Sequence, residues 1–325
     1  MEQNTLEVRD LTVSFRTEAG VVTPVRKVSL DVPAGSITGL VGESGCGKSM
    51  TARAIMGLIR PPGRITGGCI SLCGREISQL SPREHRRLRG AEIAMIFQEP
   101  MTSLNPVMKV GRQVEEAILL HTDCTRSAAI ARTLELFRQV EIPEAETRFH
   151  CYPHQLSGGL RQRVMIAMAM ACRPRLLIAD EPTTALDVTV EAQILSLLEK
   201  LRDMGTSILI ISHNLGVITR ICDRVSVMYA GQIVEQADTE ELFRQPMHPY
   251  TLGLFRAVMS LLEDAPLLET IPGVVPNLRR LPEGCAFSLR CGTCAQRCEK
   301  CMPELREAAP GHLVRCFMPE GDRDA

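Results

Sequence analysis

The sequence contains no Trp and only three Tyr and eight Phe among its 325 residues. So few aromatic side chains argue against the stacking platforms that bind single-stranded nucleic acids. An excess of one charge sign is also lacking, because 37 basic residues face 38 acidic ones and the formal net charge is −1. A near-neutral chain has no general attraction for a polyanion. Nucleic acid is therefore not expected as the main partner.

Long apolar segments are missing as well. The longest uncharged apolar stretch, Val164–Cys172, is far shorter than the ~20 residues that span a bilayer. The N-terminus lacks the basic and then apolar pattern of a signal peptide. With 45% hydrophobic and 23% charged residues, the composition is that of an ordinary globular protein. We expect a soluble intracellular chain.

Between residues 6 and 259, short apolar runs alternate with segments of helical periodicity. The strand-like runs are residues 36–41, 93–97, 176–180, 207–212 and 224–229, and the helical segments are 49–58, 111–121, 127–140, 158–171 and 189–204. This order predicts an α/β fold with a mostly parallel sheet. The two successive helical segments between 111 and 140 interrupt the alternation and predict a helical lobe.

A phosphate-binding loop follows the first of these runs. Gly42-Glu43-Ser44-Gly45-Cys46-Gly47-Lys48-Ser49 matches the pattern GxxxxGK[ST] and opens a predicted helix, as the motif requires. Glycines let successive backbone N–H groups curl around phosphate oxygens. Lys48 would reach the β- and γ-phosphates, and the Ser49 hydroxyl would bind Mg²⁺. The segment predicts a nucleotide site.

An acidic pair, Asp180-Glu181, ends the buried-strand run 176–180. The C-terminal ends of parallel strands form the edge at which α/β folds bind ligands. Asp180 would hold Mg²⁺, and Glu181 would polarise the attacking water as general base. Alone, such a pair is a common solvated turn, but beside a phosphate loop it indicates catalysis.

A third element is Leu156-Ser157-Gly158-Gly159, at the start of a predicted helix. Ser157 is a suitable N-cap, and two glycines allow a close approach of backbone to an anion. From spacing alone, an ordinary capped helix is favoured.

Together these motifs resemble those of the ATPase subunits of ATP-binding-cassette (ABC) transporters. The segment 156–163, ending in Arg-Gln-Arg, is similar to the signature motif that completes the ATP site of the opposing subunit in that family. The resemblance also implies roles for four residues elsewhere. These are Gln98 of the Q-loop, Asp187 of the D-loop, the switch histidine His213, and Phe15, which would stack on adenine.

The resemblance is closer to the importers of dipeptides and oligopeptides, whose relatives also carry nickel and glutathione. It includes an extended Q-loop at residues 95–106 and two short motifs at 152–155 and 248–251. It continues into the tail at Gly284-Cys285, Phe287, Arg290-Cys291, Cys298 and Gly311-His312 to Cys316. Nearly the whole chain is thereby covered.

Three residues depart from the family pattern. Leu160 replaces a Gln, Asn214 replaces the Asp after the switch histidine, and Cys46 replaces a Ser. None of these changes removes a catalytic group, so the resemblance implies an active ATPase.

The thiol of Cys46 would lie among the N–H groups of the loop at a helix N-terminus. It is therefore expected to have a lowered pKa and to react readily with alkylating agents.

The tail contains six of the thirteen cysteines: Cys285, Cys291, Cys294, Cys298, Cys301 and Cys316. Zinc ribbons separate their CxxC pairs by ~15–20 residues, so the short gaps here do not fit. Iron–sulfur clusters accept more compact spacing. Spacing alone leaves the ligand set ambiguous, and an extension that binds no metal is the alternative. The resemblance implies a [4Fe–4S] cluster on Cys285, Cys291, Cys298 and Cys316.

The resemblance implies a subunit that hydrolyses ATP to import peptides or a related small solute. Phe15, residues 42–49 and Asp180 would bind Mg²⁺-ATP, with Ser49, Gln98 and Asp180 as Mg²⁺ ligands. Glu181, His213 and Gln98 would carry out hydrolysis. Ser157 and Gly159 of one subunit would contact the γ-phosphate held by the other, and Gly158 and Asp187 are expected to belong to the same nucleotide-binding set.

The expected architecture is an ABC-type ATPase core at residues 1–262 with a helical lobe at about 99–160. A Pro-rich connector (263–281) and a Cys-rich region (282–325) follow. The expected partners are a second, homologous ATPase subunit in a heterodimer, two integral membrane permease subunits and an extracytoplasmic solute-binding protein. The chain would lie at the cytoplasmic face of the membrane. A soluble ABC ATPase acting on nucleic acid or ribosomes and an ATPase-linked redox sensor remain alternatives.

Overall fold

The computed structural model describes residues 4–18, 20–99, 103–184, 186–262 and 271–318. The chain forms two compact units, and each is described by itself. The first unit comprises Met1–Leu6, Val32–Ile37 and Leu72–Ile211, and the second comprises Glu7–Asp31, Thr38–Ser71 and Ser212–Ala325. Residues 100–102 of the expected Q-loop, residue 185 and residues 263–270 of the expected connector lie outside the described ranges.

Parallel strands form the centre of the first unit. Strand β7 (Leu176–Asp180) pairs in parallel with β6 (Ile93–Ile96) on one side and with β8 (Ser207–Ser212) on the other. All residues of the three strands are buried. Burial on both faces explains why these strands are continuous apolar runs rather than alternating ones. The parallel α/β arrangement expected from the sequence is confirmed.

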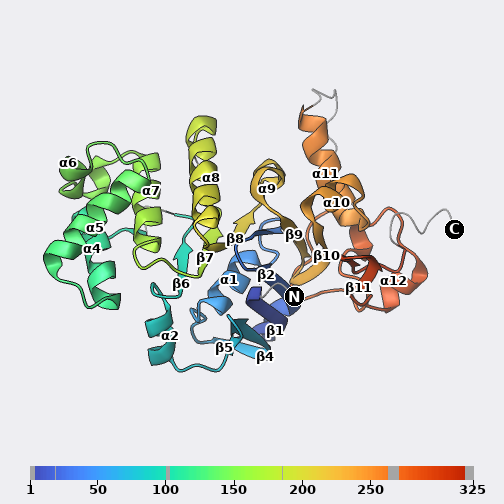
Figure 1. The fold of residues 1–325 in the computed structure, drawn as a ribbon. Helices are drawn as coiled ribbons and strands as arrows, with labels where there is room; N and C mark the ends of the chain where they lie inside the picture. The colour runs from blue at the N-terminus through green and yellow to red at the C-terminus, as the bar shows by residue number, and fades with distance from the viewer. Residues whose placement is uncertain (1–3, 19, 100–102, 185, 263–270, 319–325) are drawn as a thin grey trace. The chain divides into compact units, whose positions relative to one another are not determined.

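Helices make up most of the rest of this unit (Figure 1). They are α2 (Pro82–Leu88), α4 (Val110–His121), α5 (Arg126–Gln139), α6 (Ala145–Phe149), the 3₁₀ helix η1 (Pro153–Gln155), α7 (Gly158–Ala169) and α8 (Val188–Asp203). A short strand, β5 (Arg75–Glu76), precedes α2.

Helices α4, α5, α6 and α7 pack against one another. The buried carboxylate of Glu115 on α4 accepts hydrogen bonds from Arg112 at 3.0 Å and from Arg126, at the start of α5, at 2.8 Å. Gly111 on α4 is needed where α6 comes close, because a Cβ there would lie 2.2 Å from the Phe149 ring. These contacts explain why the two successive helical segments form one helical cluster.

The second unit contains two groups of strands. In one, β1 (Asn4–Thr17) lies between β2 (Gly20–Pro33) and β4 (Gly63–Leu72). In the other, β9 (Arg224–Tyr229) pairs in parallel with β3 (Ile37–Val41) and antiparallel with β10 (Gln232–Asp238). The helices of this unit are α1 (Lys48–Ile55), α9 (Leu215–Ile221), α10 (Thr239–Arg244), α11 (Pro249–Leu262), η2 (Ser288–Arg290) and α12 (Gln296–Lys300).

The Cys-rich tail adds strands to this second group. Strand β12 (His312–Val314) pairs antiparallel with β10, and β11 (Arg306–Ala309) pairs with β12. In register, Val314 lies opposite Glu235 and Leu313 lies opposite Gln236. The tail therefore extends, beyond β10 and β9, the group of strands that contains β3.

A buried polar cluster joins the tail to β10. Glu235 and His312 are fully buried, and His312 Nε2 lies 2.7 Å from Glu235 Oε1. The Glu235 carboxylate also accepts the backbone N–H groups of Met247 at 2.6 Å and His248 at 3.0 Å. Three groups from two segments, residues 247–248 and His312, thus surround one buried carboxylate, as buried polar groups require.

Candidate functional site

The phosphate loop connects β3 to α1, as the motif requires. Gly42, Gly45 and Gly47 have φ angles of 151°, 80° and 111°, which glycine adopts readily. A Cβ at Gly42 would lie 2.1 Å from the Met228 carbonyl oxygen, and one at Gly47 would lie 2.4 Å from the Pro24 carbonyl oxygen. Two of the motif's glycines are therefore required by both backbone conformation and close packing.

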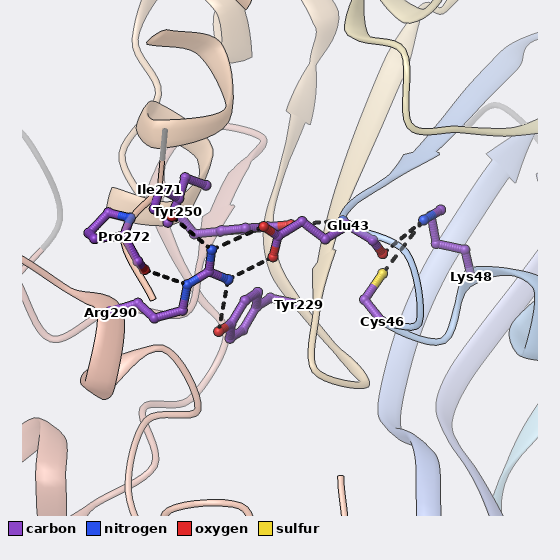
Figure 2. A network of polar contacts seen from close by, with 8 residues as sticks. All are labelled: Glu43, Cys46, Lys48, Tyr229, Tyr250, Ile271, Pro272 and Arg290. Carbon is purple, nitrogen blue, oxygen red and sulfur yellow. Dashed lines mark hydrogen bonds and ion pairs between the residues drawn. The ribbon is translucent and has the colours of Figure 1, made fainter. Parts of the chain in front are cut away.

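Lys48 is the first residue of α1 and is only 5% exposed. Its ammonium group donates to the carbonyl oxygens of Gly42 at 2.6 Å and Glu43 at 3.1 Å. The positive charge is thereby held within the curl of the loop (Figure 2). Ser49 follows in the first turn of the same helix.

The expectation for Cys46 is wrong. Its side chain is fully buried, and this burial raises the pKa of the thiol more than nearby Lys48 lowers it. A buried thiol with a raised pKa is a poor nucleophile, so rapid alkylation is not expected. The motif locates Cys46 at a helix N-terminus but does not reveal its burial.

Phe15 and His213 belong to the same unit as the loop. Phe15 is half-buried on β1, and a Cβ at Gly63 would lie 2.4 Å from its ring. His213 is exposed directly after β8. The neighbouring Asn214 caps α9 by accepting the Gly216 N–H at 2.9 Å. Asn and Asp are equally good caps, so this departure from the family pattern preserves the local structure.

In the first unit, the structure brings Gln98 and Glu181 together. The Gln98 side-chain amide donates to Glu181 Oε2 at 2.8 Å, and the Thr184 hydroxyl donates to the same oxygen at 3.0 Å. Glu181 has φ 49°, a strained conformation of the kind that clusters at functional sites. Asp180, at the end of β7, is only 4% exposed. Thr184 was not anticipated, because its contribution depends on the turn after Glu181.

The signature segment begins α7. Ser157 accepts the Leu160 N–H at 3.4 Å as an N-cap, and both Ser157 and Gly158 are exposed. At Gly159 a Cβ would lie 2.9 Å from Val190 on α8. Asp187 caps α8 by accepting the Val190 N–H at 2.9 Å. Ser157 and Asp187 therefore both serve as caps within the chain.

Four of the six tail cysteines line one hollow: Cys285, Cys291, Cys298 and Cys316. His248 and Phe287 also line it, and Cys294 and Cys301 do not. None of the thirteen cysteines forms a disulfide within the chain. Among the described residues, no group of three or more His, Cys, Asp or Glu side chains is arranged to hold a metal ion.

Burial dominates the electrostatics of this hollow. It raises the pKa of the Cys285 thiol to about 11, and the neighbouring cysteines contribute further. It also lowers the pKa of His248 to about 4, so this imidazole is neutral at physiological pH. Gly284 is required beside the hollow, because a Cβ there would lie 2.1 Å from the Cys298 carbonyl oxygen.

Tyr250 and Arg290 contact the phosphate loop. Both belong to the family motifs, but the motifs assigned no function to either. The Glu43 N–H donates to the Tyr250 hydroxyl at 2.9 Å, and the Glu43 carboxylate accepts both Arg290 terminal nitrogens, as Figure 2 shows. Tyr250 and Arg290 were recognisable only as family motif residues. Nothing in the sequence indicates that the loop is their partner.

None of the helices in the part of the chain that the structure describes has the length and apolar character needed to cross a bilayer.

Residues 25–184 match the family described as ABC transporter. Residues 234–298 match the family described as oligopeptide/dipeptide transporter, C-terminal region.

Close relatives extend over nearly the whole chain. The oligopeptide transport ATP-binding protein OppD of Salmonella typhimurium is 51% identical over 97% of this chain and 93% of its own. The dipeptide transport ATP-binding protein DppD of Escherichia coli is 46% identical over 98% of this chain and 97% of its own. A solved dimeric structure of an ATP-binding cassette, in a post-hydrolysis state with ADP and Pi, matches with a TM-score of 0.66 and 25% identity, over 72% of this chain and 98% of that one. The chain is therefore an ATPase that belongs to the ABC transporter family, in the group of oligopeptide and dipeptide transport ATP-binding proteins.

Proposed function

We propose that this chain hydrolyses ATP to drive the import of di- or oligopeptides, or a related small solute, through partner membrane subunits. The observation that carries the proposal is the Glu181 carboxylate held by Gln98 and Thr184 at the end of a parallel strand. A carboxylate oriented by two donors is suited to accept a proton from water. The names of the relatives supply the solute class.

Each expected site residue has a role in this proposal. Phe15 stacks on adenine, and the loop Gly42, Glu43, Ser44, Gly45, Cys46, Gly47, Lys48 and Ser49 holds the phosphates. Ser49, Gln98 and Asp180 bind Mg²⁺, which when bound neutralises phosphate charge. Glu181 activates water, and His213 assists it. The buried charge of Lys48 and the compact glycine turns support phosphate binding at the loop.

A second, homologous ATPase subunit completes the site in this proposal. Ser157, Gly158, Gly159 and Asp187 face the nucleotide of the partner subunit. The exposure of Ser157 and Gly158 supports this role, because a second chain can reach them. One related cassette has been solved as a dimer in two structures, which also supports it. We further propose that the two ATPase subunits differ in sequence.

The remaining partners are two integral membrane permeases and an extracytoplasmic solute-binding protein, with this chain at the cytoplasmic face. The proposed division of the chain is an ATPase domain at 1–262 with its helical lobe at about 99–160, a connector at 263–281 and a Cys-rich region at 282–325. Nucleic acid has no part in this arrangement.

Purification of the tagged chain from its native membrane tests these partners. We expect permease subunits to co-purify, and peptides presented by the binding protein to stimulate ATP hydrolysis by the reconstituted assembly. Co-purifying nucleic acid or ribosomes, without membrane subunits, would instead support a soluble ABC ATPase. A chain whose activity responds to redox state and not to any solute would support a redox sensor.

We also propose that Cys285, Cys291, Cys298 and Cys316 bind a [4Fe–4S] cluster. The support is their shared hollow, since four thiols around one space suit a group larger than a single ion. When bound, the cluster would supply iron–thiolate bonds that hold together a tail with little core of its own.

Anaerobically purified protein is expected to be brown and to contain about four irons per chain. Replacing any one of the four cysteines with Ser should remove the colour. The matched controls, Cys294→Ser and Cys301→Ser, should keep it because neither side chain lines the hollow. Zinc in place of iron, measured by elemental analysis, would contradict the cluster. A brown Cys316→Ser variant would contradict only the ligand set.

A further inference from the structure

Glu43 places a carboxylate in the phosphate loop, although the proposed ligand of this loop is a polyanion. A carboxylate so close to bound phosphates would repel them unless its charge were compensated. Arg290 provides that compensation: its Nη1 lies 2.7 Å from Glu43 Oε2 and its Nη2 lies 3.1 Å from Glu43 Oε1. This is the bidentate geometry of the strongest ion pairs.

Arg290 is itself fixed in this orientation. Its side chain is only 4% exposed, and its Nε donates to the Pro272 carbonyl oxygen at 2.9 Å. Its Nη2 also donates to the Ile271 carbonyl oxygen at 3.3 Å, and its Nη1 lies 3.4 Å from the Tyr229 hydroxyl (Figure 2). The Glu43 contact raises the pKa of the guanidinium further, so Arg290 stays charged. All three side-chain nitrogens are engaged before any nucleotide arrives.

Glu43 transmits this restraint to the rest of the loop. Its N–H donates to the Tyr250 hydroxyl, and its carbonyl oxygen accepts the Lys48 ammonium. Tyr250 is packed against Tyr229 with ring centroids 4.6 Å apart, and burial raises the pKa of its phenol. Glu43 therefore contacts Arg290 through its side chain, Tyr250 through its N–H and Lys48 through its carbonyl oxygen.

We propose that Arg290 is a positioning residue for ATP binding, which acts through Glu43 without touching the nucleotide. It neutralises the loop carboxylate, turns it away from the phosphates and holds the start of the loop in place. The proposal rests on the proposed function, because it requires the loop to bind Mg²⁺-ATP. An unmodified chain that fails to bind ATP would overturn the proposed function, whereas the comparison of variants tests Arg290 alone.

The experiment measures the dissociation constant for Mg²⁺-ATP on the full chain by calorimetry. All variants carry Glu181→Gln, so that ATP persists. Arg290→Ala is expected to weaken ATP binding about ten- to a hundredfold, the effect of losing hydrogen bonds to a charged group. Arg280→Ala is the matched control, because Arg280 is exposed ten residues before Arg290 and should leave the constant unchanged.

The decisive variant is the double substitution Arg290→Ala with Glu43→Gln. Removing the carboxylate removes the need for compensation, so ATP binding should return to within about threefold of Glu43→Gln alone. A purely structural role of Arg290 would not be rescued in this way. The ATP affinity of Arg290→Lys should lie between those of the parent and of Arg290→Ala. Lys keeps the positive charge but cannot form the two parallel hydrogen bonds of a guanidinium.

Two results would overturn the proposal. One is an Arg290→Ala variant that binds ATP within about twofold of the parent. The other is a double variant that binds as weakly as Arg290→Ala alone. If Arg290→Ala does not fold, as judged by circular dichroism, Arg290→Lys and its combination with Glu43→Gln carry the same test.

Discussion

Replacing Glu181 with Gln is expected to leave ATP binding intact and to lower ATP hydrolysis by ~10²–10⁴-fold, as loss of a general base does. Gln keeps the size of the side chain and an oxygen that can still accept from Gln98 and Thr184, whose contacts are 2.8 Å and 3.0 Å in the native protein. The substitution removes the negative charge and, with it, the capacity to take a proton. The measurement is the turnover of ATP by the chain assembled with its transporter partners.

Glu240→Gln is the matched control. It makes the same chemical change at a residue that is exposed on α10 and lies outside the proposed site. Its turnover should equal that of the native chain. Near-native hydrolysis by the Glu181→Gln variant would show that the base lies elsewhere. Loss of ATP binding in that variant would show that Glu181 holds the nucleotide rather than activating water.

Replacing Glu235 with Ala is expected to lower the free energy of unfolding by about 3–5 kcal/mol, because a buried donor that loses its acceptor costs about 1–3 kcal/mol and several lose it here. The substitution leaves His312 Nε2 and two backbone N–H groups buried without their acceptor. Because β12 pairs with β10 at this residue, the tail should detach first. Urea unfolding followed by circular dichroism measures the change.

Glu235→Gln offers a graded comparison, since its amide oxygen can still accept from part of the cluster. It should unfold between the native chain and the Ala variant. The exposed Glu240→Ala should change the free energy of unfolding by less than about 0.5 kcal/mol. An equally small effect of Glu235→Ala would mean that water or a rearranged side chain replaces the lost acceptor.

The central strands were predictable because burial on both faces leaves a distinctive sequence pattern. The runs 176–180, 207–212 and 224–229 have the same bounds as β7, β8 and β9. Helices α4 and α5 begin and end within one residue of the expected segments. Local apolar periodicity is sufficient for such elements.

Strands β1, β2, β4, β5, β10, β11 and β12 were not among the predicted runs. The first two mix buried, half-buried and exposed positions, and the positive φ angles of Asp10 and Lys27 interrupt their alternation. Strand β10 contains the buried polar residues Glu235 and Gln236, which do not resemble a core strand until their partners are known. Strand β12 also depends on pairing with the distant strand β10, which a local pattern does not encode.

The same distinction applies to the site. The phosphate loop and the acidic pair are contiguous motifs whose chemistry can be inferred from spacing. The burial of Cys46 and the contacts of Glu43 with Tyr250 and Arg290 arise only in three dimensions. The wrong expectation for Cys46 has this origin, because a helix N-terminus lowers a thiol pKa only if burial does not outweigh it.

The pairing of Glu43 with Arg290 also has a consequence for biosynthesis. The two residues are 247 positions apart, so at ~5–20 residues per second the ribosome adds Arg290 about 12–50 s after Glu43. During that interval the nascent phosphate loop carries an uncompensated carboxylate. High affinity for ATP would therefore be acquired only near the end of translation, and a chain released before residue 290 would compete poorly for cellular nucleotide.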